Sequence, residues 1–281
     1  MWIKKFKPTT PGRRAMTWNT FEEITASKPY KPLTVKLKKN SGRNNTWRLT
    51  IRHQGWGHAQ RYRLVDFYCV DKKWIDAVVE TIEYDPYRSA FISLICYKDW
   101  ERRYVIAHKD MKVWDKVLTD ESTSLKSWNR MEVWNIPVWL QVYNLELIVW
   151  QGASSIRSAW SFWTIVSQEW KYTQVKMPSA EVRLVHKKCY ATLWQVSNPD
   201  YNQIVIWKAW RSRWMWKRPT VLGKSMNPVD HPHGGWEWHS PIWMKAPKTP
   251  WWMPALGYKT RNRKKITNRW ILKTRKGKLL V

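Results

Sequence analysis

The residues best equipped for chemistry cluster towards the C-terminal end, where Asp230, His231 and His233 stand together and Glu237 and His239 follow. A histidine beside a carboxylate can act as a general base, and several histidines can ligate a metal ion. The spacing is not that of a zinc motif, and adjacency in sequence does not create catalytic geometry. We therefore expect a proline-punctuated loop whose polar groups bind RNA or their own backbone. His231 and Asp230 are only weak catalytic candidates, and no metal site is expected.

A second group of residues consists of arginines, lysines and histidines interleaved with aromatic side chains. Arginine and lysine neutralise phosphates, while aromatic rings and guanidinium planes stack on splayed bases. These residues lie inside β-rich segments as well as in the tails, which favours nucleic-acid binding over a solvated basic face. The predicted RNA-binding residues are Arg43, Arg48, Arg52, His53, His58, Arg61, Arg63, Arg88, Arg211, Arg213, Lys217, Arg218, His231, His233, Arg261 and Arg263.

Two glycine-containing turns, at 55–58 and 234–238, could bring the backbone close to a phosphate. Neither has the glycine spacing of a nucleotide-binding loop, so no nucleotide cofactor is expected. Cys69, Cys96 and Cys189 lie far apart and form no CxxC pair. The sequence therefore predicts reduced thiols rather than a zinc knuckle or a disulfide framework.

The charge balance limits the class of protein. The 281-residue chain carries 50 Lys and Arg against 21 Asp and Glu, a formal net charge of +29. Such a field is typical of proteins with a polyanionic partner and unusual for metabolic enzymes. The basic start lacks the apolar stretch of a signal peptide, and the most apolar segment, 136–150, is too short to cross a bilayer. We expect no membrane partner.

The elements that must position these residues are mostly short β-strands. Residues 1–40 are basic and lack periodicity, which predicts an extended arm. Short alternating runs separated by turns fill 41–125 and 126–200, a pattern typical of small barrels. Residues 201–281 return to basic, proline-rich sequence and predict an extended region. Strands are expected at 47–52, 62–70, 90–97, 103–106, 141–149, 172–176, 181–185 and 191–196, and one short helix at 153–159.

Motifs spread along nearly the whole chain resemble, in order, those of ribosomal protein two of the large subunit in its bacterial and organellar forms. Residues 52–58 read RHQGWGH, residues 82–90 read IEYDPYRSA, and residues 179–183 read SAEVR. The most specific stretch is 226–238, MNPVDHPHGGWEW, and the closing segment 249–261 contains TPWW and LGYKTR. Chance similarity does not explain this order.

The resemblance implies a mainly β fold, with an OB-fold barrel over 41–125 and an SH3-like barrel over 126–200. A long basic N-terminal extension over 1–40 and a C-terminal one over 201–281 flank them. It also implies a non-enzymatic structural constituent of the large ribosomal subunit, a primary rRNA binder that supports subunit association and the peptidyl transferase region. The implied partners are 23S-type rRNA, neighbouring ribosomal proteins and small-subunit contacts. The implied location is a cytoplasmic or organellar ribosome. The alternative is direct help with proton transfer in peptidyl transfer through His231.

Several positions depart from the family's pattern. Ala59 replaces a usual lysine, Leu222 replaces a frequent arginine, and Tyr143 replaces a usual histidine. Residues 152–154 read Gly-Ala-Ser where the family has Gly-Gly-Gln. The departures weaken the transfer of RNA contacts at these positions and leave the family resemblance intact.

Tryptophan is the anomaly of the composition, with 25 Trp against 10 Gly. Glycine is preferred where φ is positive, and other residues there cost roughly 1–2 kcal/mol each. We hypothesise that a gene encoding glycine by UGA has been read with a code in which UGA is tryptophan. The alternative is a tryptophan-rich platform that stacks single-stranded RNA, which predicts Trp on strand faces. The resemblance places about eighteen Trp where the family has glycine: Trp47, Trp56, Trp74, Trp100, Trp114, Trp128, Trp139, Trp150, Trp160, Trp170, Trp194, Trp207, Trp210, Trp216, Trp236, Trp238, Trp243 and Trp252.

Overall fold

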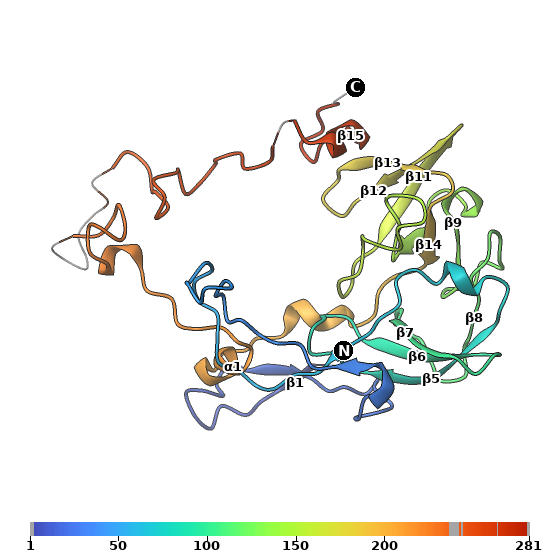
Figure 1. The fold of residues 1–281 in the computed structure, drawn as a ribbon, viewed down its shortest axis with the longest axis horizontal. Helices are drawn as coiled ribbons and strands as arrows, with labels where there is room; N and C mark the ends of the chain where they lie inside the picture. Colours follow the sequence, from blue (N-terminus) through green and yellow to red (C-terminus); the bar gives the residue numbers. More distant parts are fainter. Residues whose placement is uncertain (1–2, 236–241, 243, 263, 280–281) are drawn as a thin grey trace. The chain divides into compact units, whose positions relative to one another are not determined.

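The computed structural model describes residues 3–235, 242, 244–262 and 264–279 (Figure 1). Most of its regular structure is β. The strands are β1 (Ile3–Lys5), β2 (Thr17–Asn19), β3 (Thr34–Val35), β4 (Tyr62–Arg63), β5 (Ala77–Glu83), β6 (Ile92–Tyr97), β7 (Arg102–Ile106), β8 (Lys116–Val117), β9 (Arg130–Glu132), β10 (Gln141–Tyr143), β11 (Trp163–Glu169), β12 (Tyr172–Lys176), β13 (Val182–His186), β14 (Tyr190–Leu193) and β15 (Ile271–Lys273). Over the described residues, α1 (Ala209–Trp214) is the α-helix, and 3-10 turns lie at Lys31–Leu33, Val70–Lys72, Val133–Asn135, Pro199–Gln203, Gly223–Ser225 and Ile266–Trp270.

The first sheet has four antiparallel strands in the order β7-β6-β5-β8. Strand β6 is apolar on both faces and is buried on both. Ile95 packs into one cluster with Val79 and Phe91, while Leu94 packs against Tyr104 on the other side. The Tyr104 hydroxyl donates to Glu83 Oε2 at 2.9 Å, so the phenol is also satisfied in this second cluster. Burial on both faces shows that other parts of the barrel unit cover the sheet on both sides.

The second sheet has seven antiparallel strands in the order β15-β13-β12-β11-β10-β14-β9. Its core gathers buried residues that alternate along the strands, among them Val142, Ile165, Val175 and Leu193. A bulge between Ile165 and Ser167 shifts the β11–β12 register, and such bulges bend a strand. The chain is mainly β, and its curled sheets correspond to an OB-type barrel followed by an SH3-like barrel.

Four of the expected elements differ from the structure. Residues 47–52 form no strand, because Leu49 and Ile51 are exposed and the backbone bonds turn back to the Gly42 carbonyl. Of 62–70 only Tyr62–Arg63 is a strand, and 141–149 contains only Gln141–Tyr143. Residues 153–159 form no helix, since Ser155 pairs with Leu145 in an isolated bridge. In these segments the contacts with the rest of the fold, and not the local residue pattern, decided the secondary structure.

The chain divides into two compact units. The barrel unit comprises Met1–Lys38, Ala59–Lys208 and Thr267–Val281, and it contains the four-stranded and seven-stranded sheets together with the two-stranded pairs β1-β2 and β3-β4. The basic unit comprises Lys39–His58 and Ala209–Ile266. The basic unit contains sixteen Lys and Arg but only two Asp and Glu. The domain limits at residues 40, 125 and 200 remain a prediction.

The backbone angles distinguish one set of tryptophans from the rest. Three of the eighteen, Trp236, Trp238 and Trp243, lie outside the described residues. Of the other fifteen, thirteen have positive φ, the exceptions being Trp128 and Trp210. None of the thirteen lies in a strand. The stacking-platform interpretation expected Trp on strand faces, so the angles do not favour it.

Candidate nucleic-acid interface

Two segments far apart in sequence lie side by side in the basic unit. Residue Gln54 pairs with Lys217 in an antiparallel bridge, and the Gly55 N–H donates to the Trp216 carbonyl at 3.1 Å. On either side, the Arg218 N–H donates to the His53 carbonyl at 3.1 Å. The His58 N–H donates to the Trp214 carbonyl at 3.0 Å. These bonds fix the 39–58 loop against the segment that follows α1 (Figure 1).

At this junction the two segments lie so close together that only glycine, which has no side chain, fits between them. A Cβ added to Gly57 would lie 2.7 Å from both the Trp214 carbonyl oxygen and the Trp216 ring. Gly42 has φ +76°, and a Cβ there would lie 2.2 Å from the Ile51 carbonyl oxygen. The glycine-containing turn at 55–58 therefore serves backbone packing in this structure.

The 39–58 loop is held by its own polar side chains. The Asn44 Oδ1 accepts the Thr46 and Arg48 N–H groups at 3.0 and 2.9 Å, which is the geometry of an Asx turn. Arg43 donates to the Ser41 carbonyl at 2.5 Å and to the Gln54 carbonyl at 3.4 Å. The guanidinium of Arg43 therefore braces the loop while Arg48 remains exposed.

Helix α1 brings further cations to the same unit. The Arg213 guanidinium lies 5.5 Å from the Trp56 ring centroid, and Trp56 lies 6.2 Å from Trp210. One terminal nitrogen of Arg213 is buried and has no hydrogen-bond partner in the described part of the chain. Lys39 Nζ lies 3.9 Å from the Trp216 ring centroid. Lys39 was not among the predicted RNA-binding residues. Its membership of the basic run at 36–39 is the sequence feature that could have indicated a role in RNA binding.

The structure brings most of the predicted RNA-binding residues into the basic unit. Those in the barrel unit are Arg61, Arg63 and Arg88, and Arg263 lies outside the described residues. Arg63 is buried and donates to the Arg61 carbonyl at 2.9 Å. Arg88 is paired with the buried carboxylate of Asp85. The residues in the basic unit are Arg43, Arg48, Arg52, His53, His58, Arg211, Arg213, Lys217, Arg218, His231, His233 and Arg261.

The histidine loop is organised by imidazole-to-backbone hydrogen bonds. His231 is buried, and its Nδ1 accepts the His233 N–H at 3.0 Å. The Nε2 of His233 in turn accepts the Lys248 N–H at 2.9 Å. Burial, followed by the nearby charges of His233 and Arg52, lowers the pKa of His231. A neutral imidazole that accepts through Nδ1 carries its proton on Nε2.

The neighbours of His231 explain its orientation. A Cβ added to Gly223 would lie 2.5 Å from the imidazole ring, so glycine leaves the space that the ring fills. Within the described residues, no hydrogen bond joins the Asp230 carboxylate to His231, and Asp230 is exposed. Glu237 and His239 lie outside the described residues. The geometry is that of a braced loop and does not contain an assembled Asp–His pair.

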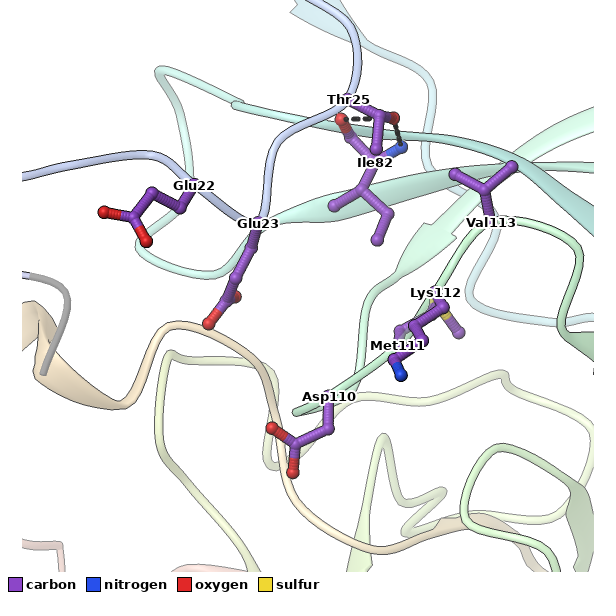
Figure 2. Close-up of a pocket in the computed structure, with 8 residues that line it drawn as sticks. All are labelled: Glu22, Glu23, Thr25, Ile82, Asp110, Met111, Lys112 and Val113. Atoms are coloured by element: carbon purple, nitrogen blue, oxygen red, sulfur yellow. Dashed lines mark hydrogen bonds between the residues drawn. The ribbon is translucent and has the colours of Figure 1, made fainter.

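A pocket of about 320 Å³ in the barrel unit has a different electrostatic character (Figure 2). Its lining residues are Glu22, Glu23, Thr25, Ile82, Asp110, Met111, Lys112 and Val113. Burial raises the pKa of Glu23, and the carboxylates of Asp110 and Asp200 raise it further. Carboxylates that repel one another would also repel phosphate, so this pocket is a poor site for nucleic acid.

The described residues contain no group of three or more His, Cys, Asp or Glu side chains placed to hold a metal ion. No helix formed by these residues is long and apolar enough to span a membrane. The side chains that the basic unit offers to a ligand are mainly cations and imidazoles.

Comparison with known families gives two matches that lie in order along the chain. The family model described as Ribosomal Proteins L2, RNA binding N-terminal domain, matches residues 30–119. The model described as Ribosomal Proteins L2, C-terminal domain, matches residues 126–252. Together the two models cover well over half of the 281 residues.

Proposed function

The chain belongs to the ribosomal protein L2 family, and from this premise we propose that it is a non-enzymatic structural protein that binds 23S-type rRNA mainly through its basic unit. Membership of the family makes it an RNA-binding protein of the large ribosomal subunit. The observation that carries the finer proposal is the backbone pairing of 39–58 with 214–218, which gathers Arg52, Arg213 and Lys217 in one unit. Clustered cations on a braced backbone suit phosphate binding, since phosphate contacts position a protein on RNA.

The same premise supports a role in assembly of the peptidyl transferase region and in subunit association. Neighbouring ribosomal proteins and small-subunit contacts are the partners we propose for it. The histidine loop at 226–234 is the part of the chain that we propose to lie towards the functional centre. Its proposed place of action is a cytoplasmic or organellar ribosome.

The dependence of RNA binding on salt tests the first proposal. We expect log K for large-subunit rRNA to fall steeply and linearly with log[KCl], because each neutralised phosphate releases counterions. Lys217→Ala should reduce the magnitude of the slope by about one, the loss of a single phosphate contact. Lys98→Ala is the matched control, since Lys98 is paired with Asp76 at 2.5 Å in the barrel unit, and it should leave the slope unchanged. A flat salt response in the parent protein would contradict the proposal.

The alternative function is proton transfer in peptide-bond formation by His231. Two features of the ring support a loop-bracing role instead: it is buried, and its Nδ1 is occupied by the His233 N–H. His231→Gln in reconstituted large subunits separates the two roles. We expect fewer assembled particles but an unchanged rate of peptide-bond formation per assembled particle. A rate that falls in fully assembled particles would favour the catalytic role.

A further inference from the structure

Positive φ among non-glycine residues is concentrated on one residue type. Of the 22 such residues in the described chain, thirteen are tryptophan and the other nine are spread over several residue types. Positive φ is uncommon outside glycine, and asparagine, aspartate and histidine are the usual exceptions. Tryptophan is bulky and has no polar group that bonds its own backbone in this region, so a positive φ at tryptophan is an outlier.

Two hairpins show what kind of position this is. In the β6–β7 turn, the Tyr97 N–H donates to the Glu101 carbonyl at 3.0 Å, and Trp100 has φ 65°. The last residue of a three-residue hairpin loop adopts the left-handed conformation and is commonly glycine. In the two-residue β11–β12 turn, Trp170 is the first loop residue and has φ 41°. Glycine is the usual residue at that position of a type II′ turn.

The end of α1 gives a third, independent motif. The Lys217 N–H donates to the Ser212 carbonyl at 3.1 Å, and the Trp216 N–H donates to the Arg213 carbonyl at 3.0 Å. This pair of bonds defines a Schellman motif, whose left-handed residue is usually glycine. Here that residue is Trp216, with φ 67°.

The indole side chains add no core packing, and their contacts are surface ones, such as the hydrogen bonds from Trp207 to the Pro11 carbonyl and from Trp216 to the His58 carbonyl. Twelve of the thirteen are exposed, and Trp216 is half-buried. Trp100 and Trp170 each leave 80% of their surface in solvent. By contrast, Trp163, whose φ is not positive, is buried in the core of the second sheet.

We propose that the protein made in its source cell carries glycine at these thirteen positions, encoded by UGA codons that the cell reads as glycine. The positions are Trp47, Trp56, Trp74, Trp100, Trp114, Trp139, Trp150, Trp160, Trp170, Trp194, Trp207, Trp216 and Trp252. The backbone angles support glycine at these positions, the codon assignment is the hypothesis that explains why tryptophan stands there, and neither depends on what the protein binds. We expect genuine tryptophan, encoded by UGG, at six further described positions without positive φ: Trp18, Trp134, Trp163, Trp214, Trp251 and Trp270.

The codons and the purified protein test the proposal directly. We expect UGA at the thirteen positions and UGG at the six, and peptide masses with glycine at the thirteen in protein isolated from ribosomes of the source cell. UGG codons at most of the thirteen, or peptide masses with tryptophan there, would overturn the proposal. Neither result bears on RNA binding, which is measured separately.

A folding comparison gives a second measurement. Three full-length chains are prepared: the printed sequence, one with glycine at the thirteen positions, and one with glycine at the six. The thirteen-glycine chain should unfold cooperatively at a higher urea midpoint than the printed sequence. The six-glycine chain should fall below both, because it loses Trp163 from the core. A printed chain as stable as the thirteen-glycine chain would overturn the conformational argument.

Discussion

Single residues in this chain are constrained more by backbone conformation than by side-chain chemistry. The clearest comparison is between two hairpin positions with nearly the same geometry. Trp100 has φ 65° and its N–H donates to the Tyr97 carbonyl at 2.9 Å, while Ala180 has φ 66° and its N–H donates to the Met177 carbonyl at 2.9 Å. Both turns need the same left-handed residue, although one bears an indole and the other a methyl group.

We therefore expect both Trp100→Gly and Ala180→Gly to stabilise the barrel unit, each by about 1 kcal/mol, because each removes a Cβ from the left-handed region. Urea unfolding followed by circular dichroism measures the change. The matched contrast is Trp163→Gly, which should destabilise by about 3 kcal/mol or more through loss of a buried indole. Equal destabilisation by all three changes would contradict the assignment.

A second residue-scale prediction concerns the space beside His231. Gly223→Ala should displace the imidazole, since the added Cβ would lie 2.5 Å from the ring, and the His231–His233 bond should be lost. Chemical shifts of the His231 ring and the affinity for large-subunit rRNA report the change. Gly235→Ala is the control, because a Cβ there meets nothing within 4 Å. If both variants behave alike, His231 does not brace the loop.

At the scale of elements, the end of β7 connects the two sheets through a buried histidine. His108 bridges to Val196, and the Lys109 N–H donates to the Gln195 carbonyl at 2.9 Å. The His108 ring stacks on Trp128 at 5.2 Å, and its Nε2 is buried without a hydrogen-bond partner in the described structure. Burial lowers the pKa of His108, against the opposite effects of the Lys109 carbonyl, Asp115 and Asp110.

This histidine should make stability depend on pH. Because its folded pKa lies below the unfolded value of about 6.5, the unfolded chain binds the proton more readily. The free energy of unfolding should therefore fall as pH drops below about 6.5, until the folded pKa is reached. His108→Phe should weaken this fall, and an NMR titration of the parent ring should show protonation only below pH 6.5. A parent ring that titrates at or above that value would contradict the prediction.

Elements also show where sequence patterns succeed. The β6–β7 hairpin and β12 are confirmed, because their apolar or alternating residues are buried as expected. The strand expected at 47–52 is wrong despite its alternation, since no apolar surface covers Leu49 and Ile51. Helix α1 has no apolar stripe to reveal it, and its geometry is set by bonds at its C-terminal end.

At the scale of the whole molecule, apolar burial and positive charge are distributed unequally. The hydrophobic clusters consist of residues of the barrel unit, and no apolar side chain among the described residues of the basic unit is fully buried. The sixteen Lys and Arg of that unit repel one another, and only two Asp and Glu offset their charge. Without a core, such a segment gains stability mainly from a bound polyanion.

Hydrogen exchange should reveal this difference. In the free protein, amides of β5, β6, β11 and β12 should be strongly protected, while those of 39–58 and 209–235 should exchange faster. Binding of large-subunit rRNA should protect the second set selectively. Equal protection of both sets in the absence of RNA would show that the basic unit has its own sufficient stability.

The sequence by itself determined the family, the mainly β class and the positive charge. A motif or a strand pattern depends only on residues that are neighbours in sequence, and the net charge is a sum over all residues, so neither requires knowledge of the fold. Only the tertiary structure decided that Gln54 lies against Lys217, that the His231 ring fills the space beside Gly223, and that Arg63 and Arg88 turn inward. Such contacts join residues through space, and their stability depends on surfaces that no single segment contains.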